Sequence, residues 1–99
     1  MNMQQMLMQA QKMQRELQKA QNELKAKEFE VSKGGAVTVV VKGDHTVKSI
    51  SIDEDAFDKD NKDMVEEMIA MAINEAIEQI EKESEAINEK VTGRSGGLF

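Results

Sequence analysis

A seven-residue repeat of apolar side chains runs through the first 27 residues of the chain. The repeat is spaced like the a and d positions of a heptad, and it is sustained over more than three heptads. Its members are Met3, Met6, Ala10, Met13, Leu17, Ala20 and Leu24. Such a seam predicts a helix over residues 1–27 that packs along its length against another helix.

The opposite side of this predicted helix is polar and basic. The c and f positions hold Gln5, Lys12, Arg15, Lys19 and Asn22. Residues 1–27 carry a net charge of +3, whereas the chain of 99 residues carries −6. The strands of residues 28–52 are neutral, and residues 53–63 and 64–90 carry −4 and −6. The first helix therefore holds the one substantial basic surface, which could touch a polyanion at short range although the whole chain repels one.

Helical spacing gives way to three β-type segments between residues 28 and 52. They are residues 28–31, 36–42 and 46–52, separated by glycine-containing turns. Apolar alternation and β-branched residues predict a three-stranded antiparallel β-meander. In the last strand Val47 and Ile50 are an odd number of residues apart. We therefore expect either a β-bulge there or partial cover on both faces.

An acidic connection leads from the meander into a second helical pattern. Phe57 is the only aromatic residue of this connection, and we expect it to tuck inward as a plug. Asp60 followed by Asp63 resembles a capping arrangement, because carboxylates are favoured at a helix start. Isoleucine and alanine residues share one face of the helix that follows, which predicts an amphipathic helix over residues 64–91.

The chain length fits one small α+β domain over residues 1–99, built as helix, three-stranded antiparallel β-meander and helix. Its predicted parts are the N-terminal helix 1–27, the β-meander 28–52, the acidic connection 53–63, the second helix 64–91 and a flexible tail 92–99. A small domain with long two-faced helices buries little surface, and a three-stranded sheet has open edges. We therefore expect self-association, with two copies paired edge to edge or through their helices.

Catalytic and metal-binding chemistry finds little support in the sequence. The chain has no cysteine and therefore no disulfide, thiolate nucleophile or zinc–thiolate site. His45, the only histidine, lies in a predicted turn, where a solvated polar role is the simpler interpretation. A calcium loop beginning at Asp58 would place Lys62 among its ligands and Ile69 at the glutamate position. We predict no enzymatic activity, no cofactor and no metal site.

The sequence also indicates a location inside the cell. No apolar run approaches the roughly 18 residues of a membrane span. The N-terminus lacks the basic and continuous apolar regions of a signal peptide. We therefore expect a cytoplasmic protein that does not associate with membranes.

The basic face and the methionines each allow two interpretations. Lys12 and Lys19 stand four residues before Glu16 and Glu23, so part of this face could be ordinary helix pairing. Five of the eight methionines lie in the first 13 residues, as adaptable core filling or as a soft partner surface. Those on the seam are expected to pack, whereas Met8, at an f position, is expected to be exposed.

Several motifs occur in an order and spacing found together in a known family. They are the N-terminal stretch MQQMLMQAQKMQRELQKAQNEL, GAVTVVVKG, VKSISID, MVEEMI and AINEA, followed by a glycine-rich tail. The chain resembles the YbaB/EbfC family of bacterial nucleoid-associated proteins over nearly all of its length. The resemblance implies a homodimer with the two sheets at its centre and helices projecting as arms. It also implies binding of duplex DNA with little sequence preference, in the nucleoid, and no known catalytic activity.

Within that family DNA binding is attributed to the projecting helices. The resemblance therefore points to Lys12, Arg15 and Lys19 of the first helix, with Lys25 and Lys27 nearer the sheet. The second helix departs from this picture because it is strongly acidic, which makes it a poor surface for phosphate.

Two hypotheses of function follow. The first is a non-enzymatic, homodimeric nucleoid protein that contacts DNA phosphates through the basic face of the N-terminal helix. The alternative is a protein-interaction module that does not bind DNA directly. It could be a prefoldin-like holder of unfolded chains, or an acidic adaptor for replication or recombination proteins.

Overall fold

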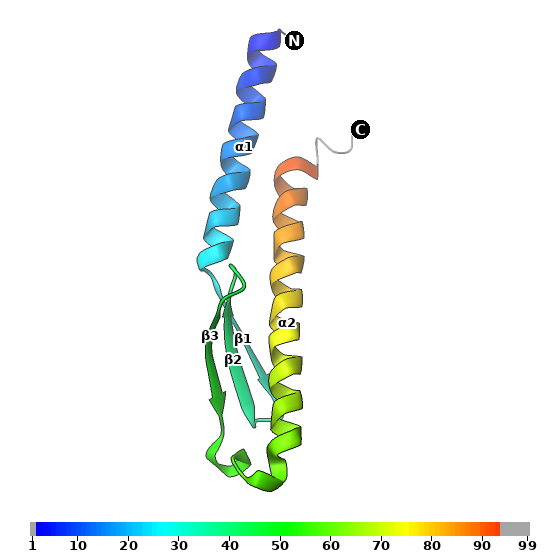
Figure 1. Ribbon diagram of the computed structural model, residues 1–99. Coiled ribbons are helices and arrows are strands. Elements are labelled where there is room, and N and C mark those ends of the chain that lie inside the picture. Colours follow the sequence, from blue (N-terminus) through cyan, green and yellow to red (C-terminus); the bar gives the residue numbers. More distant parts are fainter. Residues whose placement is uncertain (1, 94–99) are drawn as a thin grey trace.

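The computed structural model describes residues 2–93 and consists of two long helices and a small sheet (Figure 1). The elements are α1 (Met3–Ala26), β1 (Glu28–Lys33), β2 (Val37–Lys42), β3 (Val47–Ile52) and α2 (Lys62–Asn88). Two short 3-10 turns, Glu54–Ala56 and Lys59–Asn61, precede α2, and a π-helical turn, Glu89–Gly93, continues it. The predicted α+β order of helix, three-stranded antiparallel sheet and helix is confirmed. Most of the predicted tail, residues 94–99, lies outside the described residues.

The sheet has the order β1-β2-β3, with both pairs antiparallel. Its central strand buries Val37, Val39 and Val41 on the face toward α2. In β3 one extra residue, Lys48, lies between the partners of Val40 and Val41, so the strand contains a β-bulge. The bulge places Val47 and Ile50 on the same face of the sheet. It confirms one of the two expectations for this strand.

Helix α2 supplies the other layer of the core. Its buried residues are Val65, Ala72, Ala76 and Ile80. The two alanines have small side chains, which allow the helix to lie close to the sheet. Helix α2 lies over β1 and β2 and leaves most of β3 uncovered (Figure 1). The core therefore lies mainly between α2 and the strands β1 and β2, with Ile52 of β3 at its border.

The C-terminal half of α1 is joined to both α2 and the sheet. Leu24 is buried, and the amide of Gln21 donates hydrogen bonds to the Ser84 carbonyl oxygen at 3.4 Å and to Asn88 Oδ1 at 3.2 Å. The β2–β3 turn approaches so closely that a Cβ at Gly43 would overlap the Leu24 carbonyl group. The backbone N–H of Gly43 also donates to the Lys27 carbonyl oxygen at 2.9 Å. These contacts fix the direction in which α1 leaves the sheet.

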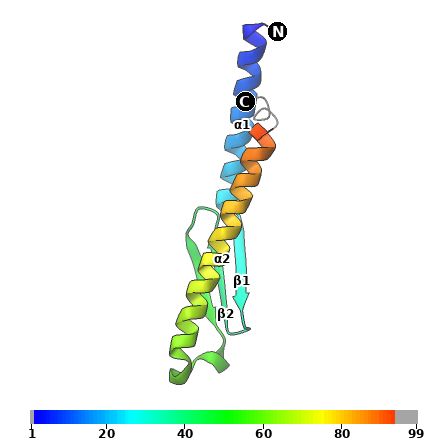
Figure 2. The ribbon, with the colours of Figure 1, turned by 90° about the vertical axis from the view of Figure 1, so that its right-hand side faces the viewer.

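The N-terminal half of α1 projects beyond the end of α2, as both views show (Figure 1, Figure 2). The side chain of Asn2 caps the helix by accepting a hydrogen bond from the Gln5 N–H at 2.7 Å. The molecule measures 69 × 22 × 14 Å, and its radius of gyration is 19.5 Å. A compact domain of this length has about 13 Å. The chain is therefore an elongated body from which α1 projects, and we call α1 the arm.

Two local expectations from the sequence are wrong. The seam of α1 does not pack along its whole length within the chain, because α2 ends first, and Met3 and Met6 are exposed. Phe57 is no plug: its side chain is 77 % exposed, and Ala56 is buried instead. The 3-10 turn Glu54–Ala56 aims the smaller residue at the core and leaves Phe57 outside.

The capping arrangement also differs from the expected one. Asp58 accepts a hydrogen bond from the Asp60 N–H at 2.8 Å and thereby caps the 3-10 turn before α2. Asn61 precedes α2 and makes no capping bond through its side chain. Asp63 lies in the first turn of α2, where its charge is favoured by the helix dipole.

Candidate nucleic-acid interface

Three basic side chains form one stripe on the exposed side of α1. Lys12, Arg15 and Lys19 are exposed and lie opposite the apolar seam. With a rise of about 1.5 Å per residue, the first and last are about 10 Å apart along the helix. Arg15 and Lys19 border an open hollow together with Gln18, Asn22 and Glu23. We call Lys12, Arg15 and Lys19 the basic stripe; it lies on the solvent side of the arm, among amide donors.

The charges of the basic stripe have no acidic partner in the described part of the chain. The pairs expected with Glu16 and Glu23 do not form, because every salt bridge found among residues 2–93 engages other residues. Helix spacing would allow these pairs, but exposed pairs of this kind gain only about 0.2–0.5 kcal/mol. The cations therefore stay available to an external anion.

Lys25 and Lys27 lie apart from the basic stripe. Lys27 Nζ is 2.6 Å from Glu83 Oε1 and stands 5.2 Å from the centre of the Phe29 ring. It thereby ties the end of α1 to α2 and the sheet. Lys25 borders a different hollow, beside His45 in the β2–β3 turn. Of the five residues predicted to contact DNA, three lie together in the basic stripe, and Lys25 and Lys27 lie apart from it.

The β2–β3 turn is held by its own hydrogen bonds. Asp44 Oδ1 accepts from the Thr46 N–H at 2.9 Å. Hydrogen bonds from the side chain and backbone of Thr46 hold the pKa of the Asp44 carboxyl below its ordinary value. His45 Nε2 lies 2.9 Å from Glu81 Oε1, so the one histidine joins this turn to α2. These contacts are structural and lie away from the basic stripe.

The exposed side of α2 carries the opposite charge. Its exposed acidic residues include Glu66, Glu67, Glu78, Glu81 and Glu85. Glu75 pairs with Lys33 of β1, and Glu83 pairs with Lys27 at the end of α1. Helix α2 therefore offers carboxylates to solvent along most of its length, and it does not extend the basic stripe.

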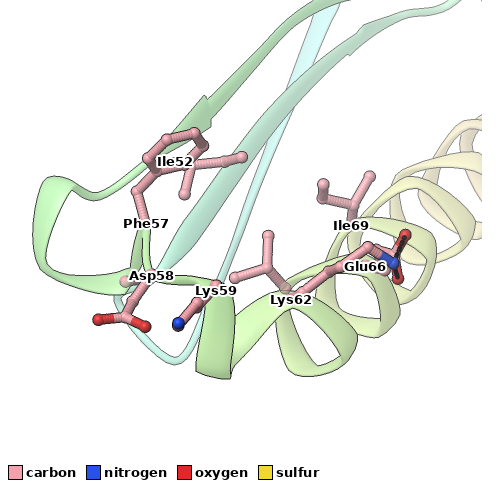
Figure 3. A pocket seen from close by; sticks show the side chains of 9 residues that line it. Ile52, Phe57, Asp58, Lys59, Lys62, Glu66 and Ile69 are labelled. Carbon is pink, nitrogen blue, oxygen red and sulfur yellow. Dashed lines mark hydrogen bonds and ion pairs between the residues drawn. The ribbon is translucent and has the colours of Figure 1, made fainter.

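A second surface, which the sequence did not predict as a site, lies beside β3. The inner-face side chains Val47 and Ile50 are 41 % and 46 % exposed, whereas Ile52 is partly buried against the core. Next to them a cavity of about 440 Å³ opens between the start of α2 and the preceding loop. Figure 3 shows Phe57 beside Ile52 on one side of it and Ile69 on the other. The odd spacing of Val47 and Ile50 was the one sequence signal that could have located this apolar surface, because it indicated the bulge that places both on one face.

Neither a metal-binding site nor a membrane-spanning helix is found among the described residues. Among residues 2–93, no three His, Asp or Glu side chains are grouped so that they could hold a metal ion. Over the same residues, neither long helix is apolar enough over a sufficient length to cross a membrane.

Comparison with known proteins places these features in a family. The model of the YbaB/EbfC DNA-binding family matches residues 1–95. A nucleoid-associated protein of Clostridium botulinum (strain Eklund 17B / Type B) is 49 % identical over 99 % of this chain and 88 % of its own length. One from Enterococcus faecalis is 45 % identical over 92 % of this chain and 88 % of its own. One from Malacoplasma penetrans is 39 % identical over 88 % and 93 %. The chain therefore belongs to the YbaB/EbfC DNA-binding family.

Proposed function

We propose that this protein is a non-enzymatic component of the bacterial nucleoid that binds duplex DNA as a homodimer. Lys12, Arg15 and Lys19 of each subunit contact phosphates, with little preference for sequence. The observation that carries this proposal is the basic stripe itself. It consists of three exposed cations without acidic partners, on the solvent side of a projecting helix. Family membership and the names of the relatives support DNA as the ligand.

The chemistry of the stripe favours backbone contacts over base reading. Lysine, arginine, glutamine and asparagine all donate hydrogen bonds to phosphate oxygens. Gln18 and Asn22 supply the amides beside Arg15 and Lys19. No aromatic side chain lies on α1, so bases have no stacking platform there. Contacts of this kind position a duplex without reading its sequence.

The homodimer is supported by the amount of exposed surface and by the place where apolar side chains lack cover. The accessible surface of the chain is 7528 Å². A compact monomer of this size exposes about 5,700 Å². The excess of roughly 1,800 Å² is more than the roughly 800 Å² that each partner contributes to a standard protein–protein interface. We place the interface at the inner face of β3 and the Phe57 cavity, where Val47, Ile50 and Phe57 lack cover.

Dimerisation would double the number of phosphate contacts. Each arm keeps its basic stripe outside the α1–α2 contact, so two stripes become available to one duplex. The acidic solvent side of α2 repels the duplex and leaves the arms as its binding surface. Lys27, which is held by Glu83, and Lys25, which lies apart, contribute less than the stripe.

Reversal of charge on the stripe tests the proposal. We expect K12E/R15E/K19E to lose at least about a hundredfold in affinity for a random-sequence duplex at low salt. Fluorescence anisotropy measures the affinity, and circular dichroism checks that the variant stays folded. The control is K82E/K90E, which reverses the charge of two exposed lysines outside both the arm and the Phe57 cavity. Wild-type affinity in a folded K12E/R15E/K19E protein, or an equal loss in the control, would refute the site.

A further inference from the structure

The tip of α1 carries an apolar surface that the DNA-binding proposal does not use. Met3, Met6 and Leu7 are exposed, and Met3 reaches 86 %. Together with Gln4 these three residues line one shallow hollow on the helix. We call the residues 3–11 the arm tip. Large exposed apolar side chains that converge on one spot mark a contact surface rather than scattered surface residues.

The arm tip continues an interface that already exists within the chain. Further along α1 the same seam packs toward α2, with Leu17 and Ala20 half-buried and Leu24 buried. Met3, Met6 and Ala10 repeat the same heptad spacing in the N-terminal half of α1, the half that projects beyond α2 (Figure 1). Heptad spacing fits the side chains of another helix, inserted as knobs into holes. The uncovered half of the seam is therefore shaped for a helix.

Charge narrows the identity of that helix. Residues 2–11 contain no charged side chain, and the first charge of α1 is Lys12. Two arm tips can therefore meet without repulsion, and their many glutamine amides can donate and accept hydrogen bonds across the contact. An acidic or a strongly basic partner would gain nothing from this neutral surface. The tip of a second arm matches it in shape, polarity and spacing.

We infer that arm tips of different molecules pair with one another as antiparallel helices. Projecting arms that approach end to end meet in this orientation, and the opposed helix dipoles favour it. A two-fold axis near Met6 and Leu7 would make the contact self-complementary. The basic stripe lies on the other side of α1, so paired tips leave it open. Two DNA-bound dimers joined in this way would link two duplex segments.

The contact is small and therefore weak for a single pair of arms. The few apolar side chains of two arm tips bury less surface area than a stable protein–protein interface does. Adjacent molecules on DNA would raise the effective concentration of tips and make many weak contacts act together. The tip pairing itself does not depend on DNA binding, whereas the linking of duplexes rests on the proposed function.

Single cysteines test the pairing, because the natural chain has none. Met6 lies on the seam and Met8 on the opposite side, with exposures of 56 % and 63 %. Under mild oxidation without DNA, we expect M6C to give at least about tenfold more disulfide-linked chains than M8C, because the bond needs close Cα atoms. The linked product should have the native mass of two dimers. Equal linking of both variants, no linking of M6C, or linking confined to the mass of one dimer would overturn the inference.

A DNA experiment tests the linking separately. A biotinylated duplex on beads, loaded with protein, is offered a second labelled duplex. We expect M6Q/L7Q to bind one duplex with wild-type affinity and to retain little of the second, whereas M8Q retains it fully. Full retention by M6Q/L7Q would contradict linking through the tips. A protein that binds no duplex would refute the proposed function and leave the cysteine result to decide on the pairing.

Discussion

At the scale of single residues, Gly43 determines how the arm is attached. It is buried where the β2–β3 turn meets the end of α1, and no side chain fits there because the Leu24 backbone occupies the space. Its N–H also donates to the Lys27 carbonyl oxygen, directly after the helix. Lys27 then pairs with Glu83 of α2. The direction of the arm thus depends on a few backbone contacts and one ion pair.

We therefore predict that G43A destabilises the protein by about 3 kcal/mol, the upper end for overpacked sites. The added methyl group meets backbone atoms, which cannot turn aside like a flexible side chain. Urea unfolding at a fixed protein concentration measures the change. G35N is the control, because Gly35 has a φ of 67° with open space around it and asparagine tolerates that conformation. A G43A protein as stable as G35N would show that the close approach does not constrain α1.

At the scale of elements, β3 is the least covered strand of the sheet. Helix α2 packs on β1 and β2, and the bulge at Lys48 keeps Val47 and Ile50 on the inner face. An edge strand with exposed apolar side chains is a template for association unless it is paired or protected. In the proposed homodimer, a second copy covers this face.

We predict that I50K converts the dimer to a monomer at micromolar concentration, because a buried lysine would lose hydration without a partner. Sedimentation equilibrium measures the mass. The control is S49K, which places the same charge on the opposite face of β3. A dimer that persists in I50K to the same degree as in S49K would place the interface elsewhere.

Local patterns predicted the order of the elements, and tertiary contacts explain what they missed. Heptad spacing indicated a helix packed on a helix, but the length of that contact depends on where the sheet places α2. The pairing of Lys27 with Glu83 joins residues 56 positions apart, which no local spacing indicates. Phe57 was expected inside because it is aromatic, and only the geometry of the preceding 3-10 turn shows it outside. The basic stripe could be predicted from the sequence because all of its residues lie on one helix, where local spacing determines the face.

At the scale of the whole molecule, charge is separated along the elongated body. The net charge is −6, yet the arm is basic and the solvent side of α2 is acidic. At physiological salt, charges beyond about 8 Å are largely screened. A duplex close to the arm therefore experiences the basic stripe more strongly than the distant carboxylates. Binding should accordingly be weakened by salt, in proportion to the number of phosphates contacted.

A salt titration of duplex binding tests the central claim, that the basic stripe contacts phosphate. Six contacts in a homodimer predict that log K falls with log salt at a slope of roughly −5. K12Q/K19Q removes four of these contacts and should reduce the slope to roughly −2, whereas K82Q/K90Q on the acidic side should keep the wild-type slope. A K12Q/K19Q slope equal to that of the wild type would contradict the account.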